Sequence, residues 1–235
     1  MSRRSERGLT MLELSVVLAI IGVLAALSFA TYERLSVRTG PQNAAADLSG
    51  ALSEARARAV DRQAEVWLII YPDIDDQGVA GQGSGGWFLV EDRRRDFGST
   101  SAPPAGHLRY ATFTPPGAVE PSPDQGSLVD AIYMDDYTRR SVRFGSTGQL
   151  VWDGVFAGLA PSACSFCTGT PRRGAIVFRE DGSARLVDGA GTTFVPTGAG
   201  AVQRAGSLGL VSSDGQHEFL FAVSGPAGFV DSRSR

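Results

Sequence analysis

The most prominent feature of the chain is a long apolar run near its N-terminal end. From Leu14 to Ala30 the sequence LSVVLAIIGVLAALSFA has no charged residue, and Glu13 is the only charge between Leu9 and Ala30. An α-helix rises ~1.5 Å per residue, so these 22 residues would extend about 33 Å. That length is enough to cross a hydrocarbon core ~30 Å thick. The run therefore predicts a membrane-spanning helix.

A second helical pattern follows between Asn43 and Gln63. Its small and apolar residues recur at helical spacing, whereas most charged residues lie off that stripe. The stripe consists of Ala44, Leu48, Ala51, Leu52, Ala55 and Ala59. Gly40-Pro41 precedes this pattern, and proline kinks or breaks a helix. The sequence leaves open one long helix kinked at Pro41 or two helices with a short joint, and either forms a stem that ends near Arg62.

After the stem the pattern changes to short apolar, β-branched and aromatic runs, which are typical of strands. Asp181-Gly182 predicts a tight hairpin between two of them, and a turn at 145–147 predicts a second pairing. Residues 189–210 predict a loop or weak strand, and the polar residues 231–235 predict a mobile tail. The candidate strands are 65–71, 87–90, 108–113, 129–134, 141–144, 148–152, 174–178, 183–187 and 218–223.

A helix whose apolar stripe covers an antiparallel sheet is an α+β architecture. We therefore expect a long N-terminal α-helix, membrane-spanning in its first half and amphipathic in its second, packed on an antiparallel β-sheet head domain. A single domain beside a membrane helix also fits the chain length of 235 residues.

The charge distribution indicates how the chain is oriented. Net charge is −3, and all 22 basic residues are arginine. Residues 1–8 carry three arginines and one glutamate, or +2, so the remainder is −5. Arg3, Arg4 and Arg7 directly precede the apolar run, which places them in the cytoplasm and the later residues outside. A net acidic chain has no broad attraction for nucleic acid.

An ordinary secretory signal does not explain the start of the chain. Such a signal has an apolar core of ~7–15 residues followed by a small-residue cleavage site. Here the apolar run is longer, Gly8 precedes it, and Glu13 follows Gly8 by five positions. A charge at membrane depth costs roughly 2.5–3.5 kcal/mol even on insertion scales, so Glu13 needs a partner.

The run Gly8-Leu-Thr-Met-Leu-Glu-Leu14 resembles the leader of type IV prepilins. The resemblance implies that prepilin peptidase cuts between Gly8 and Leu9 and methylates the new amine of Leu9. Glu13 would then be the fifth residue of the mature chain. Gly22 would be the fourteenth, where many pilins also have glycine, whereas Ala30 stands where many have proline.

The residues themselves suggest a role for Glu13 that agrees with this resemblance. Cleavage would create a cationic amine at Leu9, one helical turn from Glu13. That amine could neutralise Glu13 in its own subunit or in a neighbouring one, which makes Glu13 a candidate assembly residue. The alternative is that Glu13 only reaches the headgroups near the helix end.

A looser resemblance concerns the remainder of the stem and the strands. The run Leu48-Ser-Gly-Ala-Leu-Ser-Glu-Ala-Arg56, and Ile176-Val-Phe178 with Asp181-Gly182, are similar to minor pilins and minor pseudopilins of the GspH/FimT type. The implied organisation is a leader at 1–8, a transmembrane and assembly helix at 9–30, an amphipathic helix at 31–62, and a β-rich head at 63–235.

Cys164-Ser-Phe-Cys167 is the one CxxC motif. A redox role needs a stabilised thiolate, usually at a helix N-terminus, whereas turn-like residues follow here. A zinc site needs about four ligands, and the chain has only two cysteines and two histidines, His107 and His217. We favour a small disulfide in an oxidising compartment, which would order one loop tip.

Other motifs predict no chemistry. The Gly-rich run at 78–86 lacks the Lys-Ser/Thr of a phosphate-binding loop. The acidic run at 73–76 lacks the downstream glutamate of a calcium loop. No Ser-His-Asp grouping or paired-acid spacing is recognisable. We expect no enzyme, no cofactor and no metal site.

The C-terminal Arg233-Ser-Arg235 allows one further reading. FimT-like minor pilins that bind DNA for uptake use basic residues near the C-terminus, so Arg233 and Arg235 are candidate DNA-binding residues. The favoured interpretation is a solubilising tail.

Together these features predict a minor pilin or pseudopilin. It would be held in the inner membrane with its N-terminus in the cytoplasm and its head in the periplasm, then incorporated at or near the tip of a type IV pilus or type II secretion pseudopilus. The implied partners are other pilins or pseudopilins, prepilin peptidase, the inner-membrane assembly platform and, before assembly, the lipid bilayer. The alternative is a FimT-like DNA-binding pilus subunit.

Overall fold

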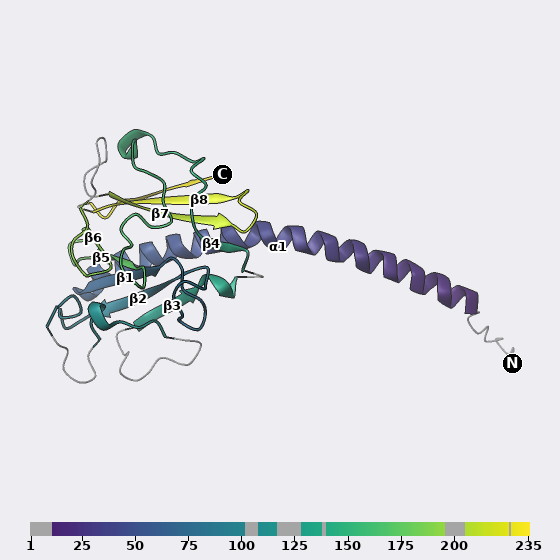
Figure 1. The fold of residues 1–235 in the computed structure, drawn as a ribbon, viewed down its shortest axis with the longest axis horizontal. Helices are drawn as coiled ribbons and strands as arrows, with labels where there is room; N and C mark the ends of the chain where they lie inside the picture. The colour runs from purple at the N-terminus through teal and green to yellow at the C-terminus, as the bar shows by residue number, and fades with distance from the viewer. Residues whose placement is uncertain (1–10, 102–107, 117–127, 138–139, 196–204, 226) are drawn as a thin grey trace, which may run out of the picture. The chain divides into compact units, whose positions relative to one another are not determined.

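A computed structural model describes residues 11–101, 108–116, 128–137, 140–195, 205–225 and 227–235 (Figure 1). The described residues divide into two compact units, with the boundary between Ser36 and Val37. One helix and nine strands make up most of the regular structure: α1 (Met11–Arg62), β1 (Glu65–Tyr71), β2 (Gly86–Asp92), β3 (Leu128–Tyr133), β4 (Val142–Phe144), β5 (Gly174–Phe178), β6 (Ala184–Val187), β7 (Ala205–Ser212), β8 (Glu218–Ser224) and β9 (Val230–Ser234).

Helix α1 continues through Pro41, so the first of the two alternatives, a single helix, is correct. Gly40 and Pro41 are both buried, and a Cβ on Gly40 would overlap the Ser141 hydroxyl. The helix ends at Arg62, whose positive charge suits the negative end of the helix dipole. Gln63 then adopts a left-handed conformation, with φ of 53°, which turns the chain into β1.

The predicted stripe of α1 is confirmed as the surface that packs in the head. Each of its six residues is at most 7% exposed, and the stripe belongs to the largest core cluster. Four of the six are alanines, which allow the helix backbone to approach its neighbours closely. The charged residues stay outside, where Glu54 and Arg58 form an ion pair of 2.7 Å.

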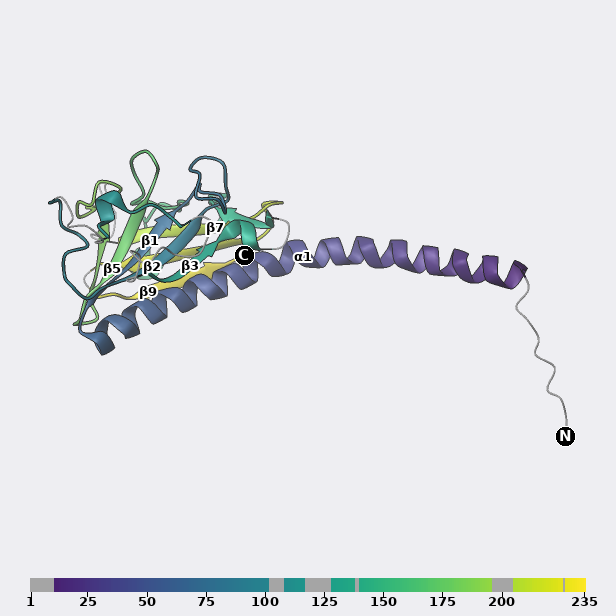
Figure 2. The same ribbon diagram turned by 90° about the horizontal axis from the view of Figure 1, so that it is seen from below.

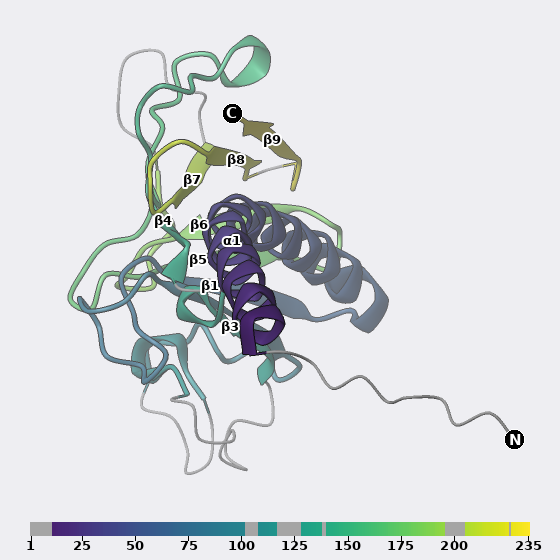
Figure 3. The same cartoon turned by 90° about the vertical axis from the view of Figure 1, so that its right-hand side faces the viewer.

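The head contains two antiparallel sheets, where the sequence predicted one. The five-stranded sheet has the order β3-β2-β1-β5-β6, and the four-stranded sheet has the order β4-β7-β8-β9. Residues of both sheets join the stripe of α1 in one core cluster, so the helix packs on the inner faces of both (Figure 3). The α+β class is therefore confirmed, and the helix packs against two sheets.

Several predicted strands are present. Strands β1, β2, β3, β4, β5, β6 and β8 occupy the expected regions within a few residues. The hairpin at Asp181-Gly182 joins β5 to β6, with Ile176 opposite Leu186. Gly182 has a φ of 77°, a conformation that glycine adopts without steric cost.

Two predicted strands are wrong, for one physical reason. Residues 108–113 form a loop with a short 3₁₀ helix, η1 (Tyr110–Thr112), and 148–152 is irregular. In both places the apolar residues cover the outer face of a sheet. Phe113 packs on Phe88 with ring centroids 5.6 Å apart, and Trp152 packs on Phe156 at 5.8 Å. Strand β4 pairs with β7 instead of with 148–152.

Two strands lie where the sequence predicted no clear strand. Strand β7 overlaps the end of the region 189–210, for which loop and weak strand were both left open, and all eight of its residues are buried. Strand β9 lies in the polar segment expected to be mobile, and its backbone pairs with β8 along one edge of the smaller sheet. Figure 2 shows β9 beside the head part of α1, and Val230 packs against the main core there.

The long loops of the head close its two outer faces. One aromatic cluster covers the five-stranded sheet, where Trp67 lies 5.3 Å from Tyr110 between ring centroids. A smaller cluster around Trp152 and Phe156 covers Leu220 and Ala222 of the four-stranded sheet. Apolar side chains are therefore buried on both faces of each sheet.

The glycines of β7 allow neighbouring segments of the chain to lie directly against the strand, which the sequence did not predict. A Cβ on Gly209 would overlap the Gly145 carbonyl oxygen and lie 3.0 Å from that of Ser162.

We expect Gly209→Ala to lower the free energy of unfolding by roughly 1–3 kcal/mol, the usual cost of overpacking. Gly50→Ala is the matched control, because its Cβ would meet nothing within 4 Å on an exposed part of α1. It should raise stability by up to about 1 kcal/mol.

Urea unfolding followed by tryptophan fluorescence measures both changes, since Trp67 and Trp87 are fully buried. Equal stability of the Gly209→Ala variant and the unchanged protein would contradict the packing described for β7.

Candidate functional site

The N-terminal part of α1 presents an apolar surface that its own unit does not cover. Its large apolar side chains are exposed, from 48% at Val17 to 88% at Met11. Within the described residues, the one helical segment long and apolar enough to cross a membrane is Met11–Ser28, with a mean hydropathy of 2.4. Such a continuous apolar surface marks contact with lipid or with other proteins.

The polar side chains in this segment suit an apolar environment. The Ser15 hydroxyl donates to the Leu12 carbonyl at 2.9 Å, and the Ser28 hydroxyl donates to that of Leu24 at 2.8 Å. Both hydroxyls are therefore satisfied inside the helix and need no water. Glu13 lies in the first turn of α1, where the helix dipole favours a negative charge. Gly8 and Leu9 lie outside the described residues.

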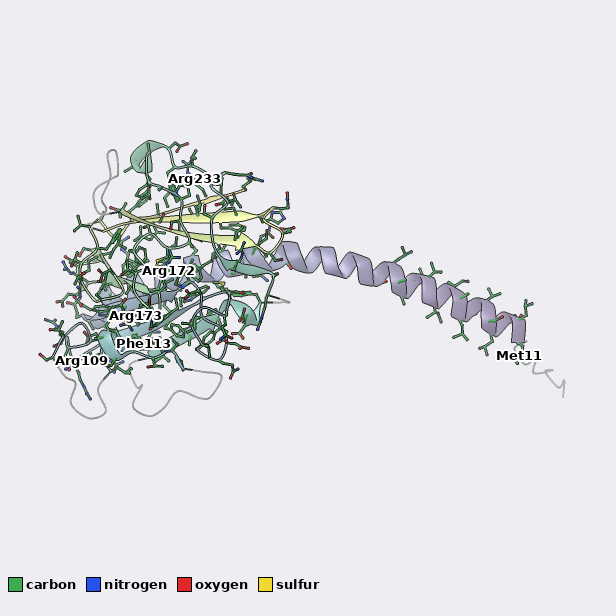
Figure 4. The ribbon with its side chains drawn as sticks, viewed as in Figure 1. Met11, Arg109, Phe113, Arg172, Arg173 and Arg233 are labelled. Carbon is green, nitrogen blue, oxygen red and sulfur yellow. A yellow bond between two sulfur atoms is a disulfide. The ribbon has the colours of Figure 1, made fainter. Side chains whose placement is uncertain are left out.

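The candidate DNA-binding residues lie on or next to strand β9. Arg233 forms an ion pair with Asp153, donates to the Val151 carbonyl at 3.4 Å, and lies 5.7 Å above the Trp152 ring (Figure 4). The hydrogen bond from Arg233 holds the pKa of Asp153 below its usual value, so the pair stays ionised. Arg235 is exposed, and its backbone pairs with Glu218.

Cys164 and Cys167 form a disulfide, with Cα atoms 5.3 Å apart. We expected this disulfide to order one loop tip. Instead, both cysteines are buried in the main core, where they are 1% and 6% exposed. Cys164 pairs with Leu208 of β7, and Cys167 lies next to the Ile70 carbonyl of β1. The motif therefore fills the space between the two sheets.

Arg172 fixes the backbone of the same motif. Its guanidinium donates to the carbonyls of Cys164 at 3.1 Å and Cys167 at 3.3 Å. Because the sulfur atoms are buried and the motif is held on several sides, the arrangement suits a structural role. A redox site instead needs an accessible thiolate.

The acidic run at 73–76 is used in local turns. The Asp75 carboxylate accepts hydrogen bonds from the backbone N–H groups of Gln77 and Val79, at 3.0 and 2.6 Å. No group of three or more His, Cys, Asp or Glu residues in the described part of the chain is placed to hold a metal ion. His107 lies outside the described residues.

The sequence reading missed a buried arginine, Arg173, beside a pocket on the outer side of the five-stranded sheet. Its contacts come from three segments that are far apart in the sequence, which contribute Tyr71, Ala111 with Phe113, and Gly189. The signal available beforehand was weak: two adjacent arginines directly before an apolar strand.

We expect the double variant Cys164→Ala, Cys167→Ala to fold with a free energy of unfolding lower by about 2 kcal/mol, the loop-entropy value for so short a ring. Urea unfolding in the absence of reductant measures the difference. In the unchanged protein, a reductant and a thiol-specific label should modify the cysteines only after urea is added. Labelling of the native protein at the rate of a free thiol would contradict the burial of the pair.

A protein-family model described as the prokaryotic N-terminal methylation motif matches residues 3–29. No curated protein and no solved structure matches the chain. The matched residues include residues 3–8 of the leader, Glu13 and all of the exposed apolar segment Met11–Ser28 of α1. The match supports a leader of the type IV prepilin kind at this end of the chain.

Proposed function

We propose that the chain is a minor pilin or minor pseudopilin, a structural subunit incorporated at or near the tip of a type IV pilus or a type II secretion pseudopilus. Prepilin peptidase would cut between Gly8 and Leu9 and methylate the new amine. The transmembrane and assembly helix would be 9–30, the amphipathic helix 31–62 and the head 63–235. The GspH/FimT resemblance of the stem and strands supports the assignment to minor subunits.

The observation that carries this proposal is the separation of two apolar surfaces on α1. The stripe from Ala44 to Ala59 is buried in the main core of the head. The large apolar side chains between Met11 and Leu27 are at least 48% exposed. This exposed surface would be available to lipid and then to the helices of neighbouring subunits.

Glu13 has a defined role in this proposal. In the bilayer its carboxylate needs compensation, and the cleaved amine of Leu9 supplies a positive charge one helical turn away. During assembly the amine of one subunit would neutralise Glu13 of the next. This charge pairing would favour a defined axial position between helices that otherwise present only apolar surface.

The covered surfaces of the head fit a role in contacts with other subunits. The described residues of the head place their long loops over the outer faces of the sheets, where aromatic side chains complete the core. A head of this size would crowd a densely repeated shaft, which matters less at a tip. We therefore propose a periplasmic head after membrane insertion, contacted by other pilins and by the inner-membrane assembly platform.

The processing step can be tested by intact-mass measurement of the protein extracted from membranes that contain prepilin peptidase. The unchanged chain should lack residues 1–8 and carry a methyl group. Gly8→Ala should remain uncut, because the peptidase requires the glycine before the cleaved bond. An uncut chain in the unchanged protein would overturn the proposal.

The assembly role of Glu13 needs a separate readout. Glu13→Ala should be cut normally, yet its recovery in sheared filaments or in crosslinked pseudopilus complexes should fall at least tenfold. Asp61→Ala is the matched control, because Asp61 is an exposed acid on the same helix, and its recovery should be unchanged. Normal recovery of Glu13→Ala would show that this carboxylate is not needed for assembly.

The alternative function, DNA binding through Arg233 and Arg235, makes a different prediction. Because Arg233 is already paired with Asp153, we expect weak binding that the double variant Arg233→Ala, Arg235→Ala does not change. A gel shift of the full-length protein in lipid nanodiscs, with duplex DNA and a salt series, measures it. Steeply salt-dependent binding that is lost in the double variant and strengthened in Asp153→Ala would favour the alternative.

A further inference from the structure

Arg173 occupies an unusual position directly before β5. Its side chain is buried, with 9% of the residue exposed, on the outer side of the five-stranded sheet (Figure 4). The chain leads into this position from a turn in which the backbones of Thr168 and Arg173 exchange two hydrogen bonds, at 2.9 and 3.0 Å. These two hydrogen bonds thus hold the backbone of Arg173 in place directly before β5.

Four hydrogen bonds hold the guanidinium. Nε donates to the Gly189 carbonyl at 3.1 Å, Nη1 to the Tyr71 hydroxyl and the Phe113 carbonyl at 3.2 Å each, and Nη2 to the Ala111 carbonyl at 3.1 Å. A guanidinium has five N–H groups. One N–H of Nη2 therefore has no acceptor among the described residues.

All of these acceptors are neutral, since three are backbone carbonyls and one is a phenol hydroxyl. Asp188 is next to a bonded carbonyl, but its carboxylate accepts from Ala190 and Thr192 of its own turn. Burial raises the pKa of the phenols of Tyr71 and Tyr110, so neither supplies a negative charge. Arg173 is thus a buried cation without a counter-ion in the described part of the chain, an arrangement that costs free energy.

The guanidinium lines a pocket of about 440 Å³, within the size range of small-ligand sites. Its walls combine apolar side chains with hydroxyl groups. The apolar residues are Ile74, Phe113, Pro115 and Pro171, and the hydroxyl groups belong to Tyr71, Thr112, Thr114 and Thr170. The Tyr71 hydroxyl already donates to the Phe113 carbonyl at 3.2 Å, and that of Thr112 to the Arg109 carbonyl at 3.5 Å. The pocket thus offers one positive charge, the hydroxyls of Thr114 and Thr170, and a partly apolar lining.

We propose that this pocket binds a carboxylate on a short apolar stem, as carried by an acidic side chain or by the C-terminus of a peptide. The carboxylate would accept from the free N–H of Arg173 and from the threonine hydroxyls, while the stem contacts the apolar walls. It would supply the counter-charge that the described residues lack. This site is distinct from the assembly surface of α1 and does not depend on the proposed function.

A titration of the unchanged, full-length protein in lipid nanodiscs tests the proposal. Three probes separate the sources of the carboxylate: acetyl-Ala-Ala with a free C-terminus, acetyl-Ala-Glu-amide, and the neutral acetyl-Ala-Ala-amide. The carboxylate probes should shift the NMR signals of the Arg173 side chain and of residues 71–80 and 111–114 in a saturable way. The tighter of the two identifies the source, and the neutral probe should cause no such shift.

The concentration range should reach about 10 mM, which would nearly saturate a site with a dissociation constant of about 1 mM. Absence of saturable shifts, or equal shifts with the neutral probe, would overturn the proposal. Arg173 would then have only a structural role, as a donor to backbone carbonyls of three segments.

The matched variants are Arg173→Gln and Arg172→Gln. Arg173→Gln should bind the carboxylate probe at least tenfold more weakly. Arg172→Gln should bind it normally, because that exposed guanidinium donates to the carbonyls of Cys164 and Cys167. Unchanged binding by a folded Arg173→Gln, or an equal loss in both variants, would refute the assignment. If Arg173→Gln does not fold, the titration of the unchanged protein decides alone.

Discussion

The alanine-rich stripe of α1 packs against two sheets at once, and the head is built around this contact. Ala44, Ala51, Ala55 and Ala59 have almost no side chain, so the strands on both sides can approach the helix backbone. Leu48 and Leu52 fill the remaining space between the sheets. A larger residue at an alanine position would have to displace a sheet, since protein cores are close-packed. The helix therefore joins both sheets in one core, together with the Cys164–Cys167 motif that lies between them.

The N-terminal part of the same helix has a second apolar surface, which contains large side chains where the stripe contains mostly small ones. Before Ser28 the large apolar side chains, such as those of Met11 and Val17, are exposed, with small residues such as Gly22 between them. Large apolar side chains give contact area to lipid and to other helices, whereas small ones give close approach. Under the proposed function, the large side chains would contact lipid and neighbouring subunits, while the alanines of the stripe pack in the head. Glu13 would then need compensation, since it is the only charge between Leu9 and Ala30.

The elements that could be predicted from the sequence are those with a local signal. The stripe of α1 and the hairpin at Asp181-Gly182 depend on spacing or on a turn dipeptide, and both are present as predicted. The wrong strand at 108–113 shows the limit of this reading, because an apolar run indicates burial without specifying an extended backbone. Strand β7 remained only one of two alternatives because Gly206 and Gly209 lower strand propensity, while in the fold they leave space for neighbouring segments. That function depends on contacts distant in sequence.

Arg173 shows that a candidate site, like a strand, can depend on contacts between residues distant in the sequence. The leader and Glu13 could be read from the sequence, because their chemistry lies within one short segment that the family model also matches. The hydrogen-bond partners of Arg173 come instead from three separate segments that meet only in the folded head. The loops that close the outer face of the five-stranded sheet also bring these segments together. The position of Arg173 could therefore not be read from any single stretch of the sequence, whereas the leader motif could.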